Sequence, residues 1–296
     1  MAGEAEGNVT TLREALPIED YESAVDRILR RRGRLEDAKV KELLTEMASV
    51  RRDLISELRN IPISDKTWRA EQIRILKSQI EIAGNRLASR YGVMLNVAID
   101  DAWELGAGFM PATLTSIGVD VSITAISTVQ LEVSKQLTGD LIKSVTQDFV
   151  SKAEKEITLG VMGARNPYEI TKRIEGLLLT QGREGFGPIA NQAERIVRTE
   201  INRTFSVANH IRTEEIDKDV KGLRHYWLAT ISGRTRPEHV SAGRRYAPGG
   251  RPGPIPIRDS FVVGGEKMRF PHDPNASAGN VIGCRCVDVL YSKEWF

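Results

Sequence analysis

The sequence has little cysteine, few aromatic residues and no long apolar run. Its two cysteines, Cys284 and Cys286, are too few for a disulfide framework. No apolar run approaches the roughly 20 residues that cross a bilayer, and residues 1–8 lack the basic and apolar segments of a secretion signal. We therefore expect no membrane partner and a protein that works in a cytoplasm. Aromatic residues make up 6% of the chain, which favours aliphatic packing between helices over an aromatic-rich β-sandwich.

Charge is unevenly distributed along the chain. The net charge is only +2, but from residue 188 onward there are 17 Lys and Arg against 12 Asp and Glu. Between Arg224 and Arg258 there are seven arginines and a single acid, Glu238. Arginines in such a group bind phosphate, carboxylate or a nucleic-acid backbone. The alternative is a loop face that is simply solvated.

The first part of the chain predicts long helices. Residues 18–60 form one helix, interrupted near Gly33 and ended by Asn60-Ile61-Pro62. Ser64 or Asp65 caps the next helix. Its apolar residues recur every three or four positions, with a repeat of 11 residues that gives an almost straight stripe suited to a partner helix. They are Leu76, Ile80, Ala83, Leu87, Tyr91, Met94, Ala98, Ala102 and Leu105, and Gly106, Gly108 and Pro111 then break the helix.

A second stripe recurs every four residues from Ile117 to Ile157. Steps of four advance about 40° around a helix, so one flat partner cannot cover this stripe. Either several neighbours cover it, which would allow a homo-oligomer, or Gly139-Asp140 divides it into two helices. A shorter helix starts at Asn166-Pro167 and runs to Leu179. The glycine-rich segment 182–188 marks the expected boundary between a helical domain, 18–182, and a module, 188–296; residues 1–17 are expected to be a flexible acidic tail.

The sequence of the C-terminal module predicts short strands and loops in addition to a helix. After a helix over 189–216, short strands are expected at 226–231 and 287–291, and a hairpin with strands 261–263 and 267–270 turns at Gly264-Gly265. Residues 246–257 hold four prolines and three glycines and predict an irregular loop. The fold class is therefore α+β: a long, mostly helical N-terminal region followed by a small module of short strands and long loops.

The residues suited to chemistry are concentrated in this module. All four histidines lie after residue 209, together with both cysteines. His239, His272, Cys284 and Cys286 could supply a tetrahedral zinc site, since cysteines two apart in an extended segment share a face. Alternatively, the cysteines are buried small hydrophobes and the histidines satisfy backbone groups. A Cys284-His-Asp273 nucleophile set is a third interpretation, although no cysteine-protease signature surrounds Cys284.

The order of three short motifs is similar to the Mu F-like head morphogenesis domain, found in minor head proteins of tailed phages. The resemblance covers about the last hundred residues. It rests on Arg198-Thr199-Glu200 with Asn202, on Trp227 followed by Arg234-Thr235-Arg236 and His239, and on Pro271 and Asp273 followed by Asn280 and Cys284-Arg285-Cys286.

The sequence departs from this family at three places. Ser232-Gly233 stands where the family often has an Asp before Arg-Thr-Arg, and Ala242-Gly243 stands where Asp-Gly often follows the His. Residues 281–283 separate Asn280 from the Cys-Arg-Cys segment. Because two acids are missing, a structural role is favoured over catalysis.

The resemblance implies a minor head (capsid) protein that acts in head morphogenesis. Such a protein is assembled in the bacterial host cytoplasm, resides in the virion at the head interior or portal vertex, contacts the portal protein and other capsid proteins, and in some members associates with double-stranded DNA. The expected DNA or portal contacts are Arg234, Arg236, Arg244, Arg245, Arg251 and Arg258. The alternative is a metal-dependent hydrolase or toxin-like enzyme domain carried by a virion protein.

Overall fold

A computed structural model describes residues 18–60, 70–121, 124–163, 165–179 and 187–294. Its helical part comprises α1 (Ile18–Arg59), α2 (Ala70–Ala107), α3 (Phe109–Thr115), α4 (Val129–Met162), α5 (Pro167–Leu177) and α6 (Pro188–Asp219). The C-terminal part comprises β1 (Arg224–Leu228), α7 (Pro237–Tyr246), β2 (Ile255–Pro256), β3 (Phe261–Val263), β4 (Glu266–Met268), α8 (Ala278–Val281) and β5 (Val287–Tyr291). This arrangement confirms the predicted α+β class.

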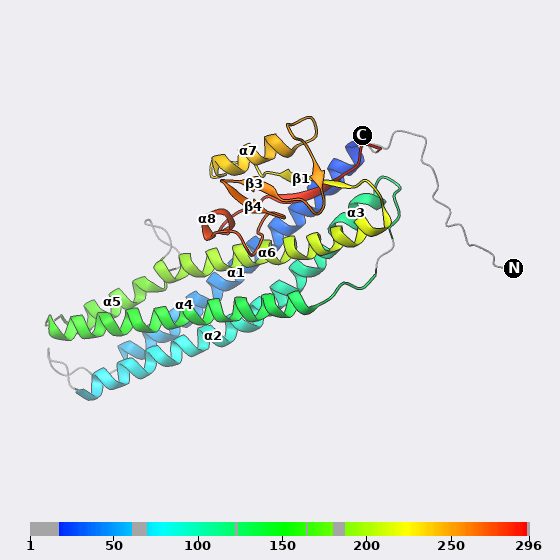
Figure 1. Ribbon diagram of the computed structural model, residues 1–296. Coiled ribbons are helices and arrows are strands. Elements are labelled where there is room, and N and C mark those ends of the chain that lie inside the picture. Colours follow the sequence, from blue (N-terminus) through cyan, green and yellow to red (C-terminus); the bar gives the residue numbers. More distant parts are fainter. Residues whose placement is uncertain (1–17, 61–69, 122–123, 164, 180–186, 295–296) are drawn as a thin grey trace.

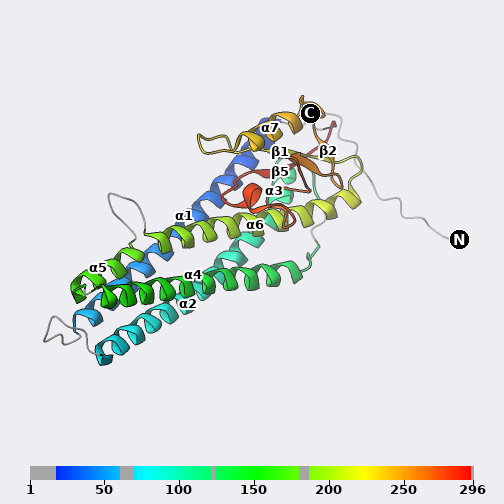
Figure 2. The same ribbon diagram turned by 60° about the vertical axis from the view of Figure 1, so that its left-hand side comes forward.

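Four long helices, α1, α2, α4 and α6, lie lengthwise against one another (Figures 1 and 2). The 11-residue stripe predicted on α2 is buried from Leu76 to Ala102, and Leu105 is half-buried. It packs with apolar residues of α1, α4 and α6 in one continuous core. The described part of the chain contains no helix long and apolar enough to span a membrane.

The predicted stripe from Ile117 is only partly helical. The helix α4 begins at Val129, because the β-branched residues before it disfavour helix, and it passes through Gly139 without a break. The division at Gly139-Asp140 is therefore wrong. Val129 is 65% exposed, whereas Val145 and Phe149 are fully buried, so the stripe turns from solvent into the bundle core as its four-residue spacing predicts.

Two other helix boundaries correct or refine the predictions. The interruption expected near Gly33 is absent, since α1 continues to Arg59. The cap expected at Ser64 or Asp65 lies outside the described residues. Asn166 caps α5 as predicted, its Oδ1 accepting a hydrogen bond of 2.9 Å from the backbone N–H of Glu169.

The C-terminal module contains two small sheets. In the first, β1 lies between β2 and β5, antiparallel to both; the second is the hairpin β3–β4. Gly264 and Gly265 have positive φ at the hairpin turn, as the sequence predicts. The strand expected over 226–231 lies at 224–228, and the expected irregular loop contains the edge strand β2. The helix α7 was not predicted.

The module rests on α6 and on the N-terminal half of α1 (Figure 1). The Tyr21 hydroxyl of α1 donates a 2.6 Å hydrogen bond to the carbonyl of Leu290 in β5. Helix α6 contributes to both parts: Ile189 to Ile201 pack in the bundle core, and Phe205 packs with β5. The domain boundary at 182–188 stays a prediction, with a helix shared by both cores immediately after it.

Candidate metal centre

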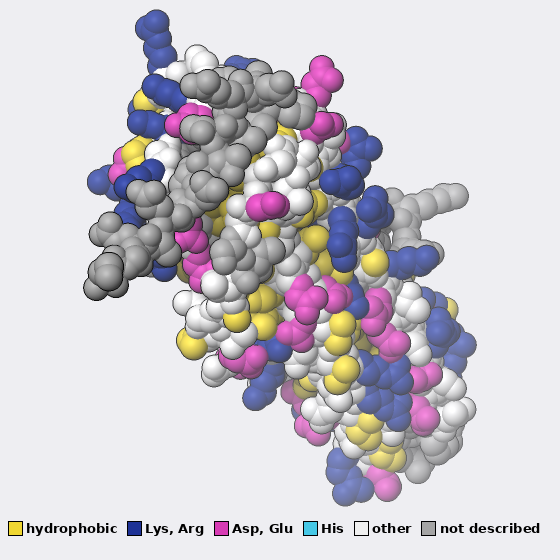
Figure 3. Space-filling view, turned by 90° about the vertical axis from the view of Figure 1, so that its right-hand side faces the viewer, with side chains coloured by type: hydrophobic (Ala, Val, Ile, Leu, Met, Phe, Trp, Pro, Cys, Tyr) yellow, Lys and Arg dark blue, Asp and Glu magenta, His cyan; other side chains and the backbone are white. Residues whose placement is uncertain are grey.

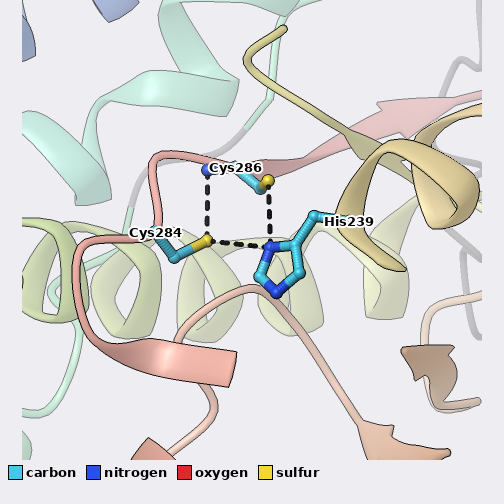
Figure 4. A group of neighbouring side chains, drawn as sticks. All are labelled: His239, Cys284 and Cys286. Atoms are coloured by element: carbon cyan, nitrogen blue, oxygen red, sulfur yellow. Dashed lines mark hydrogen bonds between the residues drawn. The ribbon is translucent and has the colours of Figure 1, made fainter. Parts of the chain in front are cut away.

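Three of the predicted metal ligands lie together in the interior of the module. The Nδ1 of His239 is 3.4 Å from the Sγ of Cys284 and 3.5 Å from the Sγ of Cys286 (Figure 4). All three residues are buried, and their ligand atoms lie within 4.8 Å of one another. This cluster can hold a metal ion.

The local sequence explains how these side chains meet. Pro237 sits in the first turn of α7, where a missing N–H costs nothing, and this places His239 in the same turn. After α8, Gly283 takes a φ of +67°, which redirects the chain toward β5. Cys284 and Cys286 lie on this connection, and the amide of Cys286 donates to the sulfur of Cys284 at 3.4 Å.

Asn280 fixes which nitrogen of His239 faces the thiols. Its Nδ2 donates to the carbonyl of Val263 at 3.3 Å, so its Oδ1 is the atom that faces the imidazole, 3.2 Å from Nε2 of His239. The Nε2–H therefore donates to Asn280, and Nδ1 presents its lone pair to Cys284 and Cys286. This is the tautomer that binds a metal.

The pKa values of the two thiols are shifted in opposite directions. A hydrogen bond between them raises the pKa of Cys284 and lowers the pKa of Cys286, and His239 lowers the pKa of Cys286 further. The buried guanidinium of Arg32 also favours the thiolate of Cys284. Metal binding requires thiolates, so the surroundings favour that form at one sulfur.

His272 and Asp273 do not belong to the cluster, which corrects the predicted four-ligand set. The Nε2–H of His272 donates to the carbonyl of Cys284 at 3.0 Å, so this histidine supports the cysteine segment from outside. Burial and the charge of Arg32 lower the pKa of His272 to about 3. The carboxylate of Asp273 accepts hydrogen bonds from the backbone N–H groups of Arg269 and Asn275, so the Cys-His-Asp set is not assembled.

A cavity of about 300 Å³ opens beside the cluster. It lies where α6 and α1 meet the loop after β1 and the cysteine segment. Nine residues of the family motifs line it: Arg198, Asn202, Arg234, Thr235, Arg236, His239, Cys284, Arg285 and Cys286. The first and last of these stretches are joined by a 3.2 Å hydrogen bond from the Gly283 amide to the Thr199 hydroxyl, across 84 residues of the chain.

The remaining motif residues serve the surrounding packing. Glu200 forms a 3.0 Å ion pair with Arg203. Trp227 is fully buried and packs edge-on against the ring of His239, with 5.5 Å between ring centroids. Pro271 is buried beside His272. These residues shape the site without lining the cavity.

The six arginines predicted to contact DNA or the portal are not brought together around the cavity. Arg234 and Arg236 line it, whereas Arg244, Arg245, Arg251 and Arg258 do not. Instead, Arg195, Arg198 and Arg285 join the first two. On the face drawn in Figure 3, the visible basic and acidic side chains are interspersed, so the described residues of that face form no continuous basic stripe.

Sequence reasoning missed two charged residues of α1 that support the site. Arg32 and Glu36 are both buried, and the Arg32 Nη2 donates a 2.8 Å hydrogen bond to the carbonyl of Arg285. A signal was present: both residues occupy positions of the apolar stripe that runs from Ile28 to Val40. Charged residues at such buried positions are rare unless they have partners.

The chain matches no protein-family model, no curated protein and no solved structure. Its resemblance to the Mu F-like domain is thus a likeness of motif residues and their order. What the protein does must be inferred from these residues and from where the fold places them.

Proposed function

We propose that the protein is a minor head protein of a tailed phage, acting in head morphogenesis with a structural role. The observation that carries this proposal is the convergence of the motifs: nine residues from three separate stretches line one cavity. Unrelated motif matches would be expected to scatter over the surface. In this role the protein would be bound to the portal protein and other capsid proteins, and associated with packaged or ejected double-stranded DNA.

The helical bundle is suited to attachment. The apolar side chains of Val93, Val129 and Val133 are each more than half exposed on the long helices α2 and α4. Exposed apolar groups on such helices are available to partner subunits in a larger assembly. The missing acids in the motifs favour this architectural role over the alternative, a metal-dependent hydrolase.

Procapsids assembled with and without the portal protein test the proposal. We expect the chain to co-purify with complete procapsids and to be lost when the portal is omitted. Recovery only in the unassembled fraction, with portal present, would contradict a head role. The variant Gly33→Ala is a suitable control for expression, because a methyl group there meets no other atom within 4 Å.

We further propose that the cluster binds zinc through His239 Nδ1, Cys284 Sγ and Cys286 Sγ. Sulfur and imidazole ligands in a small buried site are typical of Zn²⁺. The orientation of His239 by Asn280 supports the fit, because ligating histidines commonly donate their other N–H to an oxygen. The three ligands line the cavity, which leaves a fourth position for water or a bound anion.

Metal analysis of the purified full-length chain tests this site. We expect about one zinc per chain, lost in Cys284→Ser and in His239→Ala. The matched control is His272→Asn, since asparagine tolerates the left-handed backbone at this residue, whose φ is +69°, and it should retain zinc. Zinc absent from the wild type, or lost equally in the control, would contradict the three-ligand site.

A further inference from the structure

The cavity beside the cluster has the lining of a site for a small anion. Five arginines border a volume of about 300 Å³, at the lower end of the range for small-molecule sites. They are Arg195, Arg198, Arg234, Arg236 and Arg285. Two acids, Glu36 and Glu194, are the carboxylates among the lining residues.

Both acids are already engaged. Glu194 forms a 3.0 Å ion pair with Arg198, and Glu36 lies 3.9 Å from Arg32 and 3.7 Å from Arg198. Arg236 is also committed, because its Nη2 donates to the carbonyl of Ile282 at 2.6 Å. The acids therefore do not neutralise the other arginines of the cavity.

Among the described residues, four guanidinium groups of the cavity have no carboxylate partner, and three of these also lack the carbonyl partner that Arg236 has. Within the described residues, Arg195, Arg234 and Arg285 have no acidic oxygen within 4 Å, although all three line the same cavity. Like charges held around one cavity repel one another unless an anion lies between them. A phosphate group carries two negative charges near neutral pH and matches the planar fork of arginine.

Asn202 adds a requirement for a hydrogen-bond donor. Its side chain is 1% exposed, and its Nδ2 donates to the carbonyl of Arg198 at 2.7 Å. Its Oδ1 is buried, has no hydrogen-bond partner, and belongs to a residue that lines the cavity. Leaving such an acceptor unsatisfied costs about 1–3 kcal/mol. A hydroxyl group elsewhere on the ligand would satisfy it, whereas the dianionic phosphate of a monoester has no proton to donate.

We propose that this cavity binds a phosphate monoester that also bears a free hydroxyl group, the chemistry of a mononucleotide. Arg195, Arg234 and Arg285 hold the phosphate, and Asn202 accepts a hydrogen bond from the hydroxyl. The proposal requires neither the head-protein role nor bound zinc.

Calorimetric titration of the full-length chain with deoxyadenosine 5′-monophosphate tests the site. We expect saturable binding that weakens at least about tenfold in the triple variant Arg195→Gln/Arg234→Gln/Arg285→Gln. The matched control is Arg244→Gln/Arg245→Gln/Arg251→Gln, which removes the same charge away from the cavity. Absence of binding by the wild type, or equal weakening in both triple variants, would overturn the proposal.

Two further comparisons define the ligand. Asn202→Ala should weaken binding of the nucleotide while leaving binding of methyl phosphate, a monoester without a hydroxyl group, unchanged; equal weakening of both would refute the role of Asn202. A single-stranded oligonucleotide with a 5′-phosphate has no free hydroxyl on its terminal deoxyribose, so it should bind more weakly than the nucleotide; equal binding by the two would refute the need for a hydroxyl group. Binding of the nucleotide alone assigns a free nucleotide. Repeating the titration with wild-type chain treated with a chelator separates this site from zinc, since binding should persist without the metal.

Discussion

The Oδ1 of Asn280 lies 3.2 Å from the Nε2 of His239 and thereby directs the other ring nitrogen toward two thiols. The amide of Asn280 is itself held by the carbonyl of Val263 in β3. A hairpin of the module thus sets the tautomer of a histidine in α7. Because this relation is made by tertiary contacts, its removal should affect metal affinity without removing a ligand.

Replacing Asn280 by leucine tests this positioning. We expect the affinity for zinc to fall about 10- to 100-fold, the range for losing a group that orients a ligand. Competition with a chromophoric chelator measures the change. Asn280→Asp keeps an acceptor oxygen and should retain most of the affinity. Identical affinities for the leucine variant and the wild type would show that Asn280 does not orient His239.

The buried pair of Arg32 and Glu36 allows a test of how much a paired charge contributes to the stability of the bundle. Burial raises the pKa of Glu36, and the neighbouring guanidinium of Arg32 opposes this. Arg32→Met leaves the carboxylate with less compensation and removes the hydrogen bond to Arg285, so we expect a loss of about 3 kcal/mol in unfolding free energy. Denaturant titration measures it.

The double variant Arg32→Met/Glu36→Gln is the control for this pair. It removes both charges, so it should be more stable than Arg32→Met alone. A double variant no more stable than the single one would mean that the hydrogen bond to Arg285, rather than the charge of Glu36, is what Arg32 supplies.

The raised pKa of His210 predicts a loss of stability at alkaline pH. Burial lowers its pKa, but the carboxylates of Asp288 and Glu214, 3.8 and 3.4 Å from its ring nitrogens, outweigh this and raise the pKa to about 9. The unfolded value is near 6.5. The stabilisation is therefore complete below about pH 6.5 and is lost as pH rises through about 9.

Unfolding at pH 6 and pH 9 measures this effect. We expect the wild type to lose about 2–3 kcal/mol more than His210→Gln, which has no proton to release. Glu214→Gln removes the more exposed of the two acids and should give an intermediate loss. If His210→Gln lost as much stability between the two pH values as the wild type, the titrating group would lie elsewhere.

Gly106 of α2 lies directly against the backbone of α6. A Cβ atom there would overlap the carbonyl oxygen of Phe205. Gly106→Ala should therefore separate the helices and cost about 1–3 kcal/mol. Gly33→Ala, in open space on α1, should instead stabilise the chain by about 0.5–1 kcal/mol through helix propensity. Thermal unfolding distinguishes the two, and a neutral Gly106→Ala would show that the helices are not in contact there.

The amino-acid sequence by itself determined the elements whose signals are local. The spacing of Leu76, Ile80 and Leu87 predicted the buried face of α2, and Gly264-Gly265 predicted the hairpin turn, because both depend on residues close together in the chain. Helix α7 was missed although Pro237 begins it and His239, Ala242 and Tyr246 share its buried face. These three residues are spaced three and four apart, which is the signal of a helical face.

Only the tertiary structure decided which chemistry-bearing residues meet. Four candidate ligands were visible in the sequence, but the direction of each side chain depends on contacts with distant segments. His272 therefore faces a backbone carbonyl, while His239 faces both cysteines. Likewise, Arg195 and Arg198 of α6 join Arg234 and Arg285 because α6 packs beneath the module. Spacing along the chain fixes the face of an element, and packing between elements decides what that face meets.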